Sequence, residues 1–101
     1  MIRAAFSIRG DSAEFTVEGH SGAGEQGEDI LCAAVSSAAY MTVNTVTEIL
    51  GVDADAEDSD GFMRFRSCGS PSAADIVKGF RLHMEQLAKQ YPDHVTITTE
   101  V

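Results

Sequence analysis

The chain has 101 residues, the length of one ordinary domain, so a single domain over residues 1–101 is expected. Hydrophobic residues make up 44% of it and charged residues 23%, a balance that is typical of soluble globular proteins and argues against intrinsic disorder. Sixteen acidic against seven basic residues give a formal charge of −9, which argues against general binding to nucleic acid or an anionic membrane and favours a basic protein or peptide as partner.

The start of the chain, MIRAAFSIRG, lacks the long apolar run and the small-residue cleavage site of a signal peptide. No stretch has about 18 consecutive apolar residues, so no membrane-spanning segment is expected. We therefore expect the protein in the cytoplasm. In a reducing compartment Cys32 and Cys68, which lie outside any C-x-x-C pattern, are expected to remain free thiols.

Two strands are predicted first along the chain. Residues 2–9 and residues 13–19 alternate apolar and polar side chains, which is the two-residue period of half-buried strands. Gly10-Asp11 supplies a turn between them, so the two strands are predicted to form a hairpin. His20 follows directly at the end of the second strand.

A first helix is predicted over residues 30–50, which contain neither proline nor glycine. Asp29 is a good N-cap for this helix, and Gly51 is expected to end it. The segment is apolar or small on nearly every side. This pattern favours burial on more than one side, against a sheet and against a second subunit.

The acidic stretch DADAEDSDG, residues 53–61, predicts a solvated turn; its alternative interpretation is a patch that attracts a basic partner. Residues 62–67 predict a short strand, with which residues just before the acidic turn can pair. Ser70-Pro71-Ser72 opens a second helix that Pro92 ends, and residues 95–101 alternate as a last strand. The predicted order is ββαββαβ, and the predicted fold class is α+β, with two helices packed on a mainly antiparallel sheet.

The segment GAGEQG, residues 22–27, matches the G-x-G-x-x-G pattern of dinucleotide-binding loops and lies between a predicted strand and a predicted helix. The surrounding acids oppose that interpretation, because Glu25, Glu28 and Asp29 would lie where a pyrophosphate binds. The chain is also too short for two mononucleotide-binding halves. Nucleotide binding is therefore not favoured.

The same segment can instead serve a reactive thiol. With Asp29 as N-cap, Cys32 would be the third helical residue, close to the unpaired N–H groups that favour a thiolate and that could stabilise an oxyanion. The helix end contributes only about 0.3–1 kcal/mol, less than one pKa unit, so a second positive charge is needed. His20, across the glycine loop, is the candidate base and acid. A substrate backbone could approach closely at the loop glycines, Gly22, Gly24 and Gly27.

Less specific interpretations of these residues remain. A lone cysteine on an apolar helix is commonly a packed core residue, and a histidine at a strand end is commonly a surface residue. The histidines and cysteines of the chain have no spacing typical of zinc ligands, so neither a metal nor another cofactor is expected.

Residues 19–36, GHSGAGEQGEDILCAAVS, resemble the signature of the ribosomal-processing cysteine protease family, Prp, which carries G-H-[AS]-G, further glycines, then D-[IL]-[VL]-C-[AS]-[AG]-[VI]-S. The later segment GFRLHMEQLAKQYPDHVTI is similar to the second helix and last strand of that family. The resemblance implies a cytoplasmic, homodimeric endopeptidase whose catalytic dyad is His20 and Cys32. It also implies the substrate: the N-terminal extension of large-subunit ribosomal protein twenty-seven, cut after a phenylalanine.

Two further residues receive supporting roles on this interpretation. Asp29 either orients the histidine or only caps the helix. Ser36 lies one helical turn beyond Cys32 and either contacts the thiol or the substrate backbone or packs in the core. The alternative function is a non-catalytic acidic dimeric module that binds a ribosomal protein or an assembly factor, with Cys32 merely packed.

Overall fold

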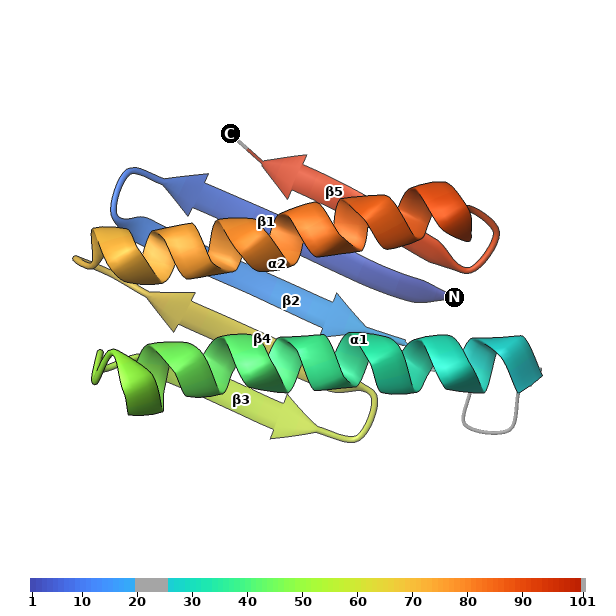
Figure 1. Cartoon of the computed structure of the whole chain (residues 1–101), viewed down its shortest axis with the longest axis horizontal. Helices are drawn as coiled ribbons and strands as arrows, with labels where there is room; N and C mark the ends of the chain where they lie inside the picture. The colour runs from blue at the N-terminus through green and yellow to red at the C-terminus, as the bar shows by residue number, and fades with distance from the viewer. Residues whose placement is uncertain (20–25, 101) are drawn as a thin grey trace.

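A five-stranded sheet forms one layer of the molecule, and two helices lie on one face of it (Figure 1). The computed structural model describes residues 1–19 and 26–100, without the side chains of residues 26–29. In chain order the elements are β1 (Ile2–Arg9), β2 (Ser12–Glu18), α1 (Gln26–Asn44), the π-helical turn η1 (Thr45–Ile49), β3 (Asp55–Ser59), β4 (Phe62–Ser67), α2 (Pro71–Gln90) and β5 (Val95–Glu100). The predicted fold class and the order ββαββαβ are confirmed.

The strand order β3-β4-β2-β1-β5 explains why both helices cover the same face. β1 pairs with β5 in parallel, and the other three pairings are antiparallel, so β2 and β3 run one way and β1, β4 and β5 run the other. α1 connects β2 to β3, and α2 connects β4 to β5. These two crossovers move in opposite directions across the sheet and start from oppositely directed strands, so crossovers of one hand place both helices on one side.

The core lies between the sheet and the helices, where an aromatic cluster fills the centre. The ring of Phe15 lies 5.9 Å from that of Phe6, 5.3 Å from that of Phe65 and 4.9 Å from that of Phe80, measured between centroids. Phe6 is in β1, Phe15 in β2 and Phe65 in β4. The two-residue period of the strands turns all three side chains toward the helices, where they are buried. The fourth comes from α2, so the cluster joins the sheet to that helix.

The second helix begins and ends as predicted. Ser70 is its N-cap, accepting a hydrogen bond from the N–H of Ala73 at 3.1 Å, and Pro71 occupies the first turn. The helix ends one residue before Tyr91, ahead of Pro92. These local signals set the two ends of α2, which packs against β1 and β2.

The acidic stretch is a strand, so its interpretation as a turn is wrong. Asp55–Ser59 forms β3, the edge strand of the sheet, and the chain turns only at Asp60-Gly61. The register explains why acids are accepted there, because Asp55 lies opposite Arg66 and Glu57 lies opposite Arg64. Cross-strand pairs of opposite charge stabilise an antiparallel pairing, and charges on an edge strand discourage pairing with other chains. The expected solvation is confirmed, since every residue of β3 is exposed.

The long first helix ends at Gly51, as predicted, where φ is +67°. Its last turn, η1, is π-helical. Threonines around this turn donate hydroxyl hydrogen bonds back along the helix: Thr45 to the carbonyl of Met41 at 2.7 Å and Thr47 to that of Val43 at 3.0 Å. Such bonds compete with the regular ladder and distort helices.

The segment Ile30–Ile49 is long and apolar enough to cross a membrane, judged by length and composition alone. This differs from the expectation that no segment has that character. Four of its apolar side chains are buried against the sheet and α2: Leu31, Val35, Ala39 and Val46. One side of the segment therefore packs into the core between the sheet and the helices.

Candidate active site

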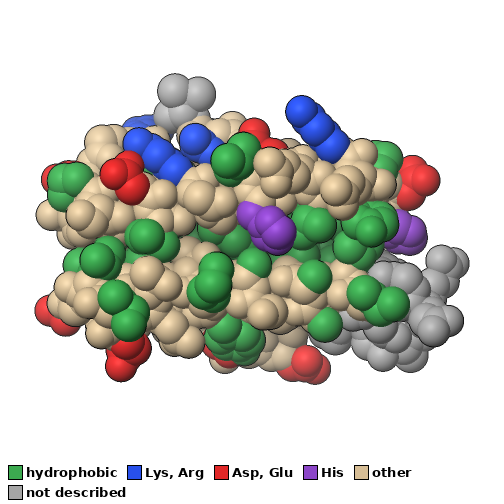
Figure 2. All heavy atoms as spheres, viewed as in Figure 1, with side chains coloured by type: hydrophobic (Ala, Val, Ile, Leu, Met, Phe, Trp, Pro, Cys, Tyr) green, Lys and Arg blue, Asp and Glu red, His purple; other side chains and the backbone are tan. Residues whose placement is uncertain are grey.

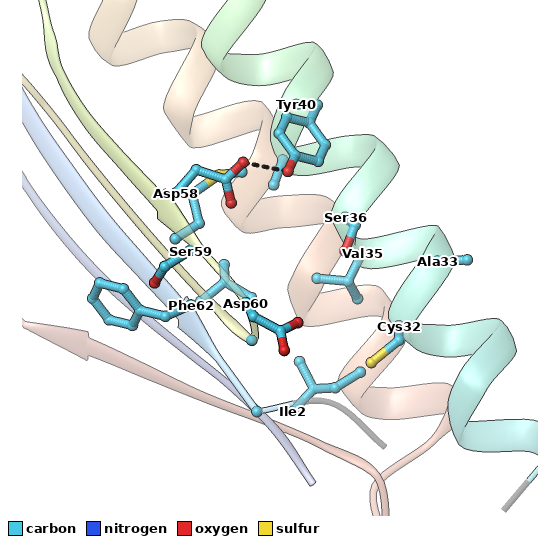
Figure 3. Close-up of a pocket in the computed structure, with 15 residues that line it drawn as sticks. Ile2, Cys32, Ala33, Val35, Ser36, Tyr40, Asp58, Ser59, Asp60 and Phe62 are labelled. Carbon is cyan, nitrogen blue, oxygen red and sulfur yellow. Dashed lines mark hydrogen bonds between the residues drawn. The ribbon is translucent and has the colours of Figure 1, made fainter. Parts of the chain in front are cut away.

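A cavity of about 550 Å³ lies between α1 and the β3–β4 hairpin, at the end of the sheet where β2 stops (Figure 3). This volume is within the range of about 300–1,000 Å³ that ligand sites occupy. Residues from α1, from the strands and from the turn between β3 and β4 form its wall: Ile2, Val17, Gly19, Cys32, Ala33, Val35, Ser36, Ala39, Tyr40, Asp58, Ser59, Asp60, Gly61, Phe62 and Met63.

Cys32 lies on the cavity side of α1. Its side chain is half-buried, packs against the hydrophobic core and is a free thiol. Ser36 follows one helical turn later and lines the same cavity, as its spacing predicted. A nucleophilic group is thus held on a rigid helix at the mouth of a recess large enough for a peptide side chain.

The start of α1 differs from the prediction. The helix begins at Gln26, so Asp29 is its fourth residue rather than its N-cap, and Cys32 is its seventh residue rather than its third. Acidic residues suit the positive end of a helix within its first turn as well as at the cap, so Glu28 and Asp29 do not fix where the helix starts. Gly27 also lies in the helix, not in a loop.

The position of Cys32 in the second turn of α1 removes one element of the predicted chemistry. At the depth of Cys32 a helical residue donates its N–H to the carbonyl four residues earlier, so that group is not free to bind an oxyanion. The helix dipole acts mainly within the first turn. Activation of the Cys32 thiol by the helix terminus is therefore not supported, and a separate base is required.

The predicted partner of the thiol, His20, lies outside the described residues, as do Gly22 and Gly24. Its neighbour Gly19 is described and lines the same cavity as Cys32. The N–H of Gly19 donates a hydrogen bond of 3.0 Å to the carbonyl of Gly61, which ties the end of β2 to the β3–β4 turn. The end of β2 is therefore part of the cavity wall.

Tyr40 and Asp58 form the far end of the cavity. The hydroxyl of Tyr40 donates a hydrogen bond to Oδ2 of Asp58, so that α1 is joined to β3 (Figure 3). This bond, followed by desolvation and the negative charge of Asp58, raises the pKa of Tyr40 above its ordinary value of 10.0. The phenol therefore remains a neutral donor at physiological pH.

Sequence reasoning missed both residues of this contact. A signal existed for Tyr40, because it continues the four-residue spacing of Cys32 and Ser36 along one helix face. No comparable signal existed for Asp58, whose place at the cavity depends on how the hairpin crosses α1.

Cys68 lies away from this site. It is exposed, beyond the end of β4, beside a separate cleft of about 160 Å³. Both cysteines are free, as predicted. Of the two, Cys32 is the one that meets the large cavity.

Comparisons with known proteins show which family the chain belongs to. The sequence model of the family described as cysteine protease Prp matches residues 1–96. The ribosomal processing cysteine protease Prp of Bacillus subtilis is 26% identical over 95 residues, which is 86% of this chain and 85% of that protein. The crystal structure of an essential ribosomal processing protease Prp from Staphylococcus aureus with a substrate peptide has a TM-score of 0.89 at 21% identity, covering 99% of this chain and 100% of that one.

A further solved structure, SMU.848 from Streptococcus mutans, has a TM-score of 0.74 at 30% identity and covers 99% of this chain and 96% of that one. The match of the family model to nearly the whole chain confirms the resemblance carried by residues 19–36. This chain belongs to the cysteine protease Prp family and is a cysteine protease.

Proposed function

We propose that this protein is an endopeptidase that removes the N-terminal extension of large-subunit ribosomal protein twenty-seven during ribosome maturation. The observation that carries the proposal is the free thiol of Cys32 at the 550 Å³ cavity of a chain that belongs to a cysteine protease family. The names of its relatives in Bacillus subtilis and Staphylococcus aureus support the ribosomal substrate.

The proposed dyad is Cys32 as nucleophile and His20 as general base and then acid. The thiolate rather than the thiol is the nucleophile, so a base that takes the proton of Cys32 is needed. The thiolate attacks the scissile carbonyl carbon, the C–N bond breaks, and His20 returns the proton to the leaving amine. Water then hydrolyses the thioester and restores the free thiol.

Supporting roles are assigned to neighbouring residues. Ser36 lines the cavity one turn from Cys32, which supports a contact with the substrate backbone. Asp29, in the first turn of α1, is proposed to orient His20. Gly22 and Gly24 are proposed to admit the substrate backbone, while Gly27 is not, because it is helical.

The shape and polarity of the cavity support cleavage after an aromatic residue. Its wall includes apolar side chains from β1, β2, α1 and β4, among them Ile2, Val17, Val35 and Met63. A phenylalanine side chain that leaves water for such a wall gains about 25 cal/mol for each Å² of apolar surface buried. The formal charge of −9 suits a basic ribosomal protein as the substrate.

A cytoplasmic homodimer is the proposed working form. The outward side of α1 and η1 exposes apolar side chains: the exposed fractions are 66% for Ile30, 67% for Met41 and 78% for Ile49. Figure 2 shows hydrophobic side chains spread over this helical face of the molecule. An exposed apolar helix face supports a partner there, and a second copy is the one proposed.

The test is cleavage of a peptide that spans the extension, with the products identified by mass spectrometry. Cys32→Ala and His20→Ala are expected to lower kcat/KM by a factor on the order of 10³ or more, because each removes a member of the dyad. Cys68→Ala is the matched control and should cleave at the wild-type rate. An uncut peptide with wild-type protein, or full activity of Cys32→Ala, would contradict the proposal; a purely binding module would lose nothing in that variant.

A further inference from the structure

The cavity extends along α1 from the reactive thiol to a hydrogen-bonded contact between its two walls. On the helix side, Cys32, Ser36 and Tyr40 follow one another at four-residue intervals, and all three line the cavity. At about 1.5 Å per residue, the rise of an α-helix, about 12 Å along the helix axis separate the first of them from the last. The cavity is therefore an elongated cleft with its nucleophile near one end (Figure 3).

The other end of the cleft is bridged from wall to wall. The hydroxyl of Tyr40, from α1, donates its hydrogen bond to Oδ2 of Asp58, from β3 (Figure 3). The floor residues Val35 and Ala39 are 2% and 1% exposed, whereas Tyr40 is 46% exposed, so this bridge lies at the level of the opening. A peptide bound in the cleft lies at the same level, and the Tyr40–Asp58 bridge crosses its path.

Both halves of the bridge are carried by elements that the core holds in place. Tyr40 directly follows Ala39, which is buried in the core, and Asp58 lies opposite Met63, which is buried as well. A substrate chain that continued between them would have to break a hydrogen bond to a carboxylate, which is stronger than one between neutral groups. The substrate chain therefore leaves the cleft at the bridge.

The distance from the thiol to the bridge sets how much of a peptide the cleft can hold. An extended peptide advances about 3.3 Å per residue, so a length of about 12 Å accommodates about three to four residues. We propose that Tyr40 and Asp58 are specificity-determining residues that limit recognition to about three or four substrate residues on one side of the scissile bond. The inference deepens the proposed function, on which it rests for the peptide nature of the ligand.

The test measures kcat/KM for two series of peptides that contain the cleavage site. One series is lengthened residue by residue on the N-terminal side of that site, the other on its C-terminal side. With wild-type protein, one series is expected to stop improving after about the third or fourth residue, because further residues lie in solvent. In Tyr40→Ala the same series should improve further, on the order of fivefold for the next residue, as for a half-buried aliphatic side chain.

Asp58→Ala removes the other half of the bridge at an exposed strand position and should move the limit of the same series. Tyr91→Ala is the matched control, because Tyr91 is the second tyrosine of the chain, is 42% exposed and lies outside the cavity wall. This control should leave both series unchanged. Binding of the same peptides to Cys32→Ala, with and without Tyr40→Ala, is measured by calorimetry, which separates recognition from cleavage.

The inference requires the shift in both bridge variants. It is overturned by an unchanged limit in Tyr40→Ala or Asp58→Ala, by wild-type kcat/KM that rises beyond the fourth residue in both series, or by an equal shift in Tyr91→Ala. The absence of measurable binding of any peptide would overturn it as well. A length limit in binding that moves with Tyr40→Ala, without any cleavage by the wild type, would uphold the inference and overturn the proposed function instead.

Discussion

Gly19 has a backbone conformation that favours glycine, and it also lines the candidate active site. Its φ is +85°, in the region that favours glycine, and a Cβ built there would lie 2.3 Å from the carbonyl oxygen of Met1. The residue also lines the cavity and directly precedes His20. A side chain here would push apart the end of β2 and the start of β1.

Gly19→Ala is therefore expected to lower the free energy of unfolding by more than Gly10→Ala. Gly10 has φ +59° but open space around its missing Cβ, so its substitution costs only the left-handed backbone, about 1–2 kcal/mol. The clash at Gly19 should add about 1–3 kcal/mol, as overpacking does elsewhere. Urea unfolding of both variants measures the difference in their free energies of unfolding. Equal losses of stability would show that the backbone near Met1 accommodates the added methyl group without destabilising the fold.

The residues that α1 contributes to the cavity could be predicted from the sequence, but those that the strands contribute could not. The four-residue spacing of Cys32 and Ser36 placed them on one helix face, and the cavity confirms it. The start of the helix was misplaced because Glu28 and Asp29 suit either a cap or a first turn. Local capping rules could not choose between these, since the choice depends on the chain that precedes the helix.

The segment of β3 has the two-residue period of a strand, but its acidic composition concealed that period. Its segment was interpreted as a turn because acids are poor strand formers, yet Ala54 and Ala56 alternate with the acids around them. The arginines that stabilise it, Arg64 and Arg66, belong to the neighbouring strand, so the pairing is a tertiary effect. The clear periodic elements, β1, β2 and α2, were predicted correctly because each carries its own apolar face and end signals.

The contact between Tyr40 and Asp58 joins α1 to β3, and it predicts an alkaline loss of stability. The folded pKa of Tyr40 is raised above 10.0, so the neutral phenol contributes stability below that pH and the contribution is lost as pH rises through the folded pKa. Tyr40→Phe should be less stable than wild type at pH 7. This difference in stability between the two proteins should disappear at strongly alkaline pH.

Thermal unfolding of both proteins across this pH range measures the gap. Absorbance of the tyrosinate band reports the ionisation of Tyr40 itself, by difference from the variant. A gap that stays constant at all pH values would mean that the hydroxyl contributes through packing rather than through its proton.

The whole molecule is a slab of about 40 × 24 × 16 Å with two unlike faces. Apolar side chains are exposed along α1 on the helical face, and Figure 2 shows hydrophobic side chains there together with histidine and lysine or arginine side chains. The open face of the sheet carries side chains of opposite charge on neighbouring strands. Arg66 on β4, for example, lies opposite Asp55 on β3 and Glu14 on β2. A second copy is thus expected on the helical face, while the sheet face remains in water.

Met41→Lys is expected to weaken self-association at least about tenfold, because it places a charge in an apolar interface. Thr98→Lys adds the same charge on β5 of the sheet and should leave association unchanged. Sedimentation equilibrium over a range of protein concentrations measures both. A monomeric wild type, or equal effects of the two lysines, would exclude the helical face as the dimer contact.

The pairing of β5 with β1 has a consequence for how the protein is made. Ile2 lies beside Val95, so one edge of the first strand has no partner until residues 95–100 have been synthesised. Closing so large a loop is entropically expensive and slow. The sheet beneath the candidate active site is therefore completed only after translation has passed the second helix, and we expect no protease activity before that point.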